Sequence, residues 1–245
     1  MPKPSTLNQS LINSLTFRGG IVDLVGLAIL LVLTATKTSA APACDNYNPD
    51  RNAYFGDLHV HTAISADAVG YNVTIRPDEA YRYAFGGVAN LPDVQGETTR
   101  QYQNPRPLDF MAVTDHAEHM GEVVVCKDSS SEGYNSEYCD VMRNSAGTNP
   151  WMMVKGIVSP FASHDKGVCG DDGSRCELGQ AKVWQETQDA AKNWNSECEH
   201  TAFVAYEYSS FRLGSNLHRN VIFRNDKVPA LPVSHIEAPH DYQLW

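Results

Sequence analysis

Short apolar runs alternate with amphipathic segments along the chain, and this pattern predicts a mixed α/β fold. Six segments are assigned: strands at 54–61, 108–114, 202–208 and 220–224, and helices at 77–85 and 177–194. Pro77 fits the first turn of its helix and Gly86 follows the end of that helix. Trp184, on the apolar face of the second helix, is expected in the core.

The strand at 54–61 ends in two histidines that can share a ligand. His59 and His61 are two positions apart, so a β-strand projects both from one face. The small residues that follow allow a tight turn that brings Asp67 back over the strand end. Imidazole and carboxylate groups together suit zinc, iron or manganese. The alternative is an ordinary strand with two surface histidines.

Other predicted strands carry similar residues at or near their ends. Asp115 and His116 follow the strand at 108–114, and His218 precedes the strand at 220–224. Ligands in α/β folds gather at the carboxyl ends of strands, which places His116 with the first pair. Glu207 lies in an aromatic and apolar strand, and an unpaired buried carboxylate costs several kcal/mol. A metal ion or another cation is therefore expected beside Glu207.

The order of these motifs carries a family resemblance. His-x-His, Ser-x-Asp, Thr-Asp-His, a strand Glu and a further His occur in one sequence from residue 59 to residue 218. This order resembles the polymerase-and-histidinol-phosphatase (PHP) superfamily of metal-dependent phosphoesterases. The likeness is strongest to an uncharacterised bacterial branch, a domain-of-unknown-function family. It covers roughly residues 51–245, apart from the region between the second and third motif blocks.

The resemblance implies a fold, a site and a reaction. The implied fold is a distorted (β/α)7 TIM-like barrel. The implied metal ligands are His59, His61, Asp67, His116, Glu207 and His218. Glu207 would bridge two ions, while Asp115 would orient a ligand or hold a loop. Two or three divalent ions (Zn, Mn or Fe) would activate water for hydrolysis of a small-molecule phosphoester.

The motifs that usually close such a site are missing from this chain. The superfamily adds a further histidine and a final Asp-x-His, whereas the tail offers His235, His240 and Asp241 in a different order. We therefore expect the barrel and the metal site to be incomplete, and the chain to be the N-terminal part of a longer protein or a truncated product. We expect this chain to bind metal weakly and to hydrolyse phosphoesters poorly. Two alternatives stay open: an amidohydrolase-like C–N hydrolase, which would need a bridging lysine, and a non-catalytic metal-binding domain.

A long insertion is expected between the second and third motif blocks, at about 120–176. Four of the six cysteines fall in this insertion, and Gly, Ser and Asp are frequent between them. Six cysteines allow about fifteen pairings, of which we favour Cys126 with Cys139 and Cys169 with Cys176. A thiolate metal site is the alternative, but the chain has no Cys-x-x-Cys pair. We expect a disulfide-pinned excursion on the face of the site.

The remaining histidines are weaker ligand candidates. His164, His200, His235 and His240 lie in polar or loop contexts without a partner at metal-ligand spacing. His119 follows His116 by three residues on a predicted helical segment, so it shares that face and is a more plausible additional ligand.

The first 40 residues have the pattern of a signal peptide. Lys3 and Arg18 precede an apolar run at 21–33, and small residues near Ala40 fit a cleavage site. We expect a periplasmic or secreted domain at 41–245 with no stable membrane insertion after cleavage; the alternative is an uncleaved N-terminal anchor. The formal charge of −10 argues against nucleic acid as a partner, because phosphate backbones need basic patches.

Overall fold

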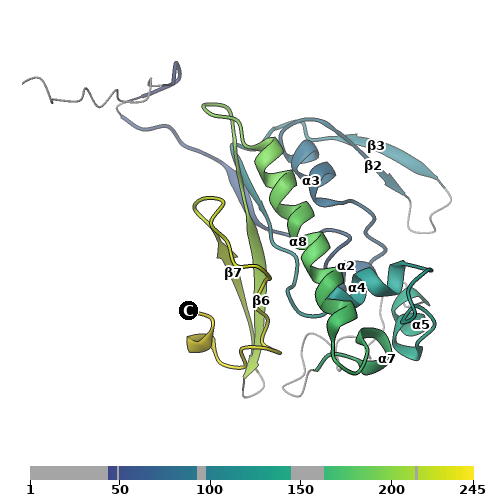
Figure 1. Cartoon of the computed structure of the whole chain (residues 1–245). Coiled ribbons are helices and arrows are strands. Elements are labelled where there is room, and N and C mark those ends of the chain that lie inside the picture. The colour runs from purple at the N-terminus through teal and green to yellow at the C-terminus, as the bar shows by residue number, and fades with distance from the viewer. Residues whose placement is uncertain (1–43, 49, 93–97, 145–162, 213–214) are drawn as a thin grey trace, which may run out of the picture. The chain divides into compact units, whose positions relative to one another are not determined.

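The computed structural model describes residues 44–48, 50–92, 98–144, 163–212 and 215–245 (Figure 1). The chain divides into two compact units, Met1–Tyr47 and Asn48–Trp245, and every described helix and strand belongs to the second. The predicted signal peptide at 1–40 lies outside the described residues. Within the described ranges, no helix combines the length and hydropathy that a membrane span requires.

A three-stranded parallel sheet forms the centre of the second unit. Its order is β1 (Gly56–Val60), β4 (Phe110–Val113) and β5 (Thr201–Phe203). The prediction that the strands at 54–61 and 108–114 are parallel neighbours is confirmed, with Gly56 opposite Phe110. Parallel neighbours need long crossover connections, and the chain supplies these with helices.

Helices make up most of those connections. Their bounds are α2 Ala66–Gly70, α3 Pro77–Ala84, α4 Met120–Lys127, α5 Glu137–Asn144, α7 Lys166–Cys169 and α8 Ser174–Trp194, with a final 3₁₀ turn η2 at Asp241–Gln243. Tyr81 of α3 and Ala191 of α8 pack against Met111 and Val113 of the central strand. These contacts bury one face of the sheet under two helices.

The helix α8 also joins the sheet to a long hairpin. The predicted helix at 177–194 is confirmed and begins three residues earlier, at Ser174. Trp184 is buried, as expected, against Tyr206, Tyr208 and Val221 of the hairpin, and in Figure 1 this green helix runs alongside the yellow-green hairpin. One helix therefore anchors both pieces of β-structure that carry the candidate ligands.

The predicted (β/α)7 barrel is wrong, because the described strands do not close into one. The strands β6 (Ala205–Arg212) and β7 (Ser215–Ile222) pair antiparallel with each other, as do β2 (Val88–Pro92) and β3 (Thr99–Gln103). Only two residues separate Arg212 from Ser215, too few for the crossover that a parallel barrel strand needs. The described structure is therefore a small parallel sheet with two hairpins.

The β6–β7 hairpin meets the central sheet just beyond the end of β4. Glu207 N donates to Asp115 O (3.0 Å), and Ala117 N donates to Glu207 O (2.9 Å). His116 and Glu207 thus form an isolated parallel bridge. From the second strand of the hairpin, Asn220 Nδ2 donates to Leu58 O (2.7 Å). These three hydrogen bonds bring the hairpin to the carboxyl ends of β1 and β4.

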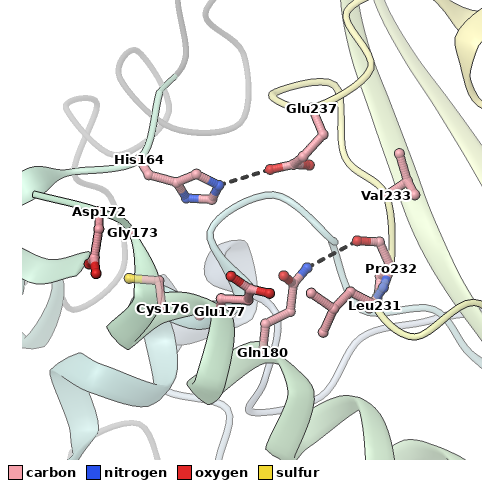
Figure 2. A pocket seen from close by; sticks show the side chains of 11 residues that line it. His164, Asp172, Gly173, Cys176, Glu177, Gln180, Leu231, Pro232, Val233 and Glu237 are labelled. Atoms are coloured by element: carbon pink, nitrogen blue, oxygen red, sulfur yellow. Dashed lines mark hydrogen bonds and ion pairs between the residues drawn. The ribbon is translucent and has the colours of Figure 1, made fainter. Parts of the chain in front are cut away.

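The predicted insertion at about 120–176 contains α4, α5 and α7. Both favoured disulfides form: Cys126 with Cys139, and Cys169 with Cys176. No described cysteine is free. A pocket of about 400 Å³ opens between the start of α8 and the segment 231–237, and Gln180 donates across it to Pro232 O (Figure 2). The insertion is therefore pinned to α8 beside an open pocket.

The tight pairing of β1 with β4 generates a stability prediction. A Cβ atom on Gly56 would collide with the carbonyl oxygen and the aromatic ring of Phe110, so Gly56→Ala must separate the two strands. We expect a loss of about 1–3 kcal/mol in the free energy of unfolding, measured by urea denaturation. The control is Gly70→Ala, because a Cβ there meets nothing within 4 Å. Equal stability of the two variants would contradict the proposed close contact.

Candidate metal centre

The end of β1 directs two imidazoles at one carboxylate. His59 Nε2 lies 3.0 Å and His61 Nε2 lies 2.8 Å from Oε2 of Glu207. The pairing of β1 with β4 is irregular between Asp57 and Val60, where β1 contains one more residue than its partner. Irregularities of this kind re-aim side chains next to functional sites. The two histidines therefore point at a shared partner, as the His-x-His spacing predicted.

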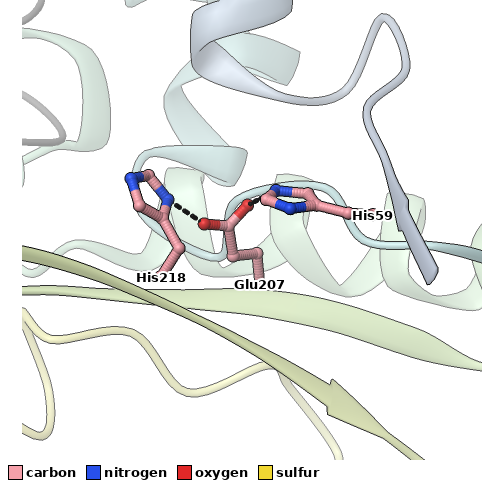
Figure 3. Close-up of side chains that lie close together, drawn as sticks. All are labelled: His59, Glu207 and His218. Atoms are coloured by element: carbon pink, nitrogen blue, oxygen red, sulfur yellow. Dashed lines mark hydrogen bonds and ion pairs between the residues drawn. The ribbon is translucent and has the colours of Figure 1, made fainter.

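The β6–β7 hairpin supplies that carboxylate and another imidazole. Glu207 and Ser209 share one face of β6, and His218 lies opposite Ser209 on β7. Glu207 Oε1 contacts His218 Nδ1 and accepts a hydrogen bond from Ser209 Oγ (2.8 Å). Figure 3 shows the Glu207 carboxylate between His59 and His218, with one oxygen turned to each.

A fourth imidazole comes from the residue that follows β4 and Asp115. His116 is buried, and its Nε2 lies 3.8 Å from Glu207 Oε2. The imidazole centroids are 4.9 Å apart for His61 and His116 and 5.6 Å apart for His116 and His218. We call these five residues, His59, His61, His116, Glu207 and His218, the central cluster. The structure thus brings together all five residues that were predicted to converge.

The two predicted aspartates occupy different positions. Asp67 Oδ1 lies 2.9 Å from His61 Nδ1, and its other oxygen lies 3.7 Å from His116 Nε2, so it borders the central cluster. Asp115 accepts hydrogen bonds from Thr62 N (2.5 Å) and Thr62 Oγ1 (2.7 Å). Of the two roles predicted for Asp115, this geometry matches the holding of a loop, here the turn that follows β1.

The charges in the central cluster stabilise one another. Burial raises the pKa of Glu207, but His61, His116 and Ser209 outweigh burial and lower the pKa to about 2. Burial lowers the pKa of His61, but Asp67 and Glu207 outweigh it and raise the pKa to about 10. The site therefore holds its carboxylates ionised at neutral pH, which is the form that binds cations.

The donor atoms are arranged in two groups that fit a divalent cation. The groups are His59, Glu207 and His218, and His61, Asp67 and His116; in each, the ligand atoms lie within 4.8 Å of one another. His61 Nε2 is buried and makes no hydrogen bond, although it lies 2.8 Å from Glu207 Oε2. His61 and Glu207 thus form an ion pair, and a divalent cation that displaces the proton of His61 would find a nitrogen and a carboxylate oxygen facing each other.

Sequence reasoning missed one carboxylate that supports this centre. Glu118 is fully buried, and its Oε2 lies 3.3 Å from His116 Nδ1. Its Oε1 accepts from Ser209 N (3.1 Å) and lies 3.3 Å from Nδ1 of His235, a histidine that the sequence had discounted. The sequence offers no clear signal for Glu118, because polar residues surround it from Thr114 to Glu122.

The other weak candidates lie in other surroundings. His200 stacks on Phe85 and His240 stacks on Tyr242. His119 was considered as an additional ligand, but its Nδ1 lies 3.3 Å from Glu122 Oε1. His164, also discounted from sequence, lies 2.8 Å from the same oxygen. His119, Glu122 and His164 therefore form a separate group.

Comparison with known proteins gives a family but no function. The family model described as protein of unknown function (DUF3604) matches residues 48–245. No curated protein and no solved structure matches the chain. The resemblance to the PHP superfamily therefore stays a prediction, and the chemistry has to be argued from the site itself.

Metal binding at the central cluster predicts a thermal shift. Addition of Zn²⁺ or Mn²⁺ at 100 times its dissociation constant should stabilise the folded state by about 2.7 kcal/mol, or about 5–10 °C in Tm. Chelation should reverse the shift, as differential scanning fluorimetry can measure. The double substitution His59→Ala, His61→Ala should reduce it, because both residues contact Glu207. An equal shift in both proteins would show that the metal binds elsewhere.

The buried partner of His116 generates a second prediction. Glu118→Gln keeps the size of the side chain but weakens the orientation of the His116 imidazole. We expect metal affinity, measured by competition with a chelator, to fall about 10–100-fold. The matched control is Glu197→Gln, which changes an exposed carboxylate. Unchanged affinity in the Glu118 variant would remove Glu118 from the site.

Proposed function

The chain belongs to the family described as protein of unknown function (DUF3604), and from its site we propose that it is a metal-dependent hydrolase of phosphoesters. One observation carries the proposal: the buried carboxylate of Glu207 is surrounded by the imidazoles of the central cluster at the carboxyl ends of β1 and β4. Such edges are where α/β folds bind ligands. The order of motifs that resembles the PHP superfamily supports the same reaction.

The donor set suits the metal ions that this reaction uses. Imidazole nitrogens and carboxylate oxygens together bind zinc, manganese and iron. When bound, such ions lower the pKa of water and neutralise charge on phosphoryl oxygens. The alternative C–N hydrolase would need a bridging lysine, and the sequence has no lysine at the end of a predicted strand.

The residues of the centre differ in how far their side chains are exposed to solvent. The side chains of His59 and His218 are 50% and 39% exposed, so they border the space in which a substrate would lie. His116 is buried, and its Nδ1 is turned to Glu118. Glu207 contacts His59 with one carboxylate oxygen and His218 with the other, and so fixes the positions of both imidazoles. The protein thus positions charge, which is the main requirement of phosphoryl transfer.

The net charge limits the substrate class. An acidic chain with a formal charge of −10 repels polyanions, whereas bound cations reverse the local field for a small anion. We therefore propose a small-molecule phosphoester as the substrate rather than a nucleic acid.

Activity assays test the proposal directly. Phosphomonoesters and phosphodiesters are offered with Mn²⁺ or Zn²⁺, and kcat/KM is compared among variants. Glu207→Gln and the double variant His59→Ala, His61→Ala should each lose at least about 100-fold, because the ligands that position charge are gone. His240→Ala is the control, since His240 stacks on Tyr242 outside the central cluster. Activity that survives both substitutions, or the absence of activity on every phosphoester, would overturn the proposal.

A further inference from the structure

A second group of ligand-type side chains lies at the start of α4. Glu122 is fully buried, and its Oε1 lies 3.3 Å from His119 Nδ1 and 2.8 Å from His164 Nδ1. One ligand atom from each residue lies within 4.8 Å of the others. We call these three residues the α4 cluster. It shares no residue with the central cluster, and its ligand atoms form a separate group.

The carboxylate of Glu122 is incompletely satisfied. Its Oε2 is buried and makes no hydrogen bond. A buried acceptor without a partner costs about 1–3 kcal/mol, and more for a charged group. In the part of the chain that the structure describes, the ionic partners of Glu122 are both histidines. A cation beside the carboxylate would remove this cost.

The distances in the α4 cluster fit coordination. Zinc binds imidazole nitrogen and carboxylate oxygen at about 2.0–2.2 Å, which places tetrahedral ligands about 3.4 Å apart. The 3.3 Å separation from His119 is of this size, whereas the 2.8 Å separation from His164 is shorter. An ion would therefore enter after His164 and Glu122 move apart by about 0.6 Å.

A further carboxylate orients His164 for this role. His164 Nε2 lies 2.9 Å from Glu237 Oε1, and Figure 2 shows this contact at the pocket. The other oxygen of Glu237 accepts from Ser234 N (2.9 Å) and Ser234 Oγ (2.5 Å), which fixes the carboxylate. When Nε2 of His164 donates a hydrogen bond to Glu237, the neutral ring has an unprotonated Nδ1, and this nitrogen faces Glu122. Metal-binding histidines are usually oriented by a carboxylate in this way.

The backbone also favours the arrangement. His119 has φ 57°, in the left-handed region that residues other than glycine seldom occupy, and it stands immediately before α4. This conformation places His119 and Glu122 next to each other at the first turn. Strain of this kind tends to be found at functional sites.

We propose that His119, Glu122 and His164 form a second divalent-cation site, with zinc as the preferred ion. Two imidazoles and one carboxylate are a known zinc ligand set. The ion would connect α4 to the segment that precedes α7. His164 and Glu237 also line the 400 Å³ pocket, which gives the ion a route to the buried carboxylate. The described cluster offers three protein ligands, so water from the pocket would complete the coordination of the ion.

The test isolates the α4 cluster from the central cluster. Zinc affinity and stoichiometry are measured in the double variant His59→Ala, His61→Ala by chelator competition and elemental analysis. We expect this double variant to bind one equivalent of zinc at the α4 cluster. Addition of His164→Gln should weaken its binding by more than about 100-fold, whereas Glu237→Gln should weaken it by about 10–100-fold, because Glu237 only orients a ligand. The matched control is Glu177→Gln, an exposed carboxylate that lines the same pocket.

Two results would overturn the proposal. The first is the absence of a zinc equivalent in the double variant, and the second is zinc binding that His164→Gln leaves unchanged. In either case the cluster is a histidine held between Glu122 and Glu237 by ion pairing alone. Near-ultraviolet circular dichroism confirms that each variant folds. If His164→Gln does not fold, Glu237→Gln decides the question, because the Glu237 side chain is 46% exposed and tolerates substitution.

Discussion

The burial of one carboxylate constrains the whole candidate centre. Glu207 is fully buried on a strand, and a charge in that position requires compensation from its neighbours. His59 lies in β1, His61 follows its last residue, and His218 lies in β7. The hairpin and the parallel sheet must therefore meet at Glu207. Their backbone bridge between His116 and Glu207 fixes that meeting point.

The segment that follows β4 supplies residues to both the central cluster and the α4 cluster. His116 faces the central cluster and is held by Glu118, whereas His119 and Glu122 face His164. The left-handed backbone conformation of His119 lies between His116, which faces one cluster, and Glu122, which faces the other. A short stretch of chain can therefore serve two sites, since each change of backbone direction re-aims the next side chain. Substitutions in this segment should be interpreted with both sites in mind.

The disulfides and α8 provide the rigidity that such sites need. Cys169 and Cys176 join α7 to the first turn of α8, and Trp184 of the same helix packs against the hairpin. Ligand geometry depends on supporting contacts of this kind, because a small displacement of one imidazole lowers metal affinity. The insertion is thus joined to the helix that supports the hairpin.

The sequence by itself determined the local elements and the chemistry at their ends. Apolar runs located β1, β4 and α8, the His-x-His spacing placed His59 and His61 together, and loop composition indicated both described disulfide pairs. Only the tertiary structure decided the topology and the supporting residues. The short connection after Arg212 makes a hairpin where a barrel strand was expected. Glu118 contacts Ser209 and His235, and Glu122 contacts His164, and all three of these partners come from distant parts of the chain. Periodicity and spacing report contacts that are near in sequence, whereas these contacts depend on how distant segments pack.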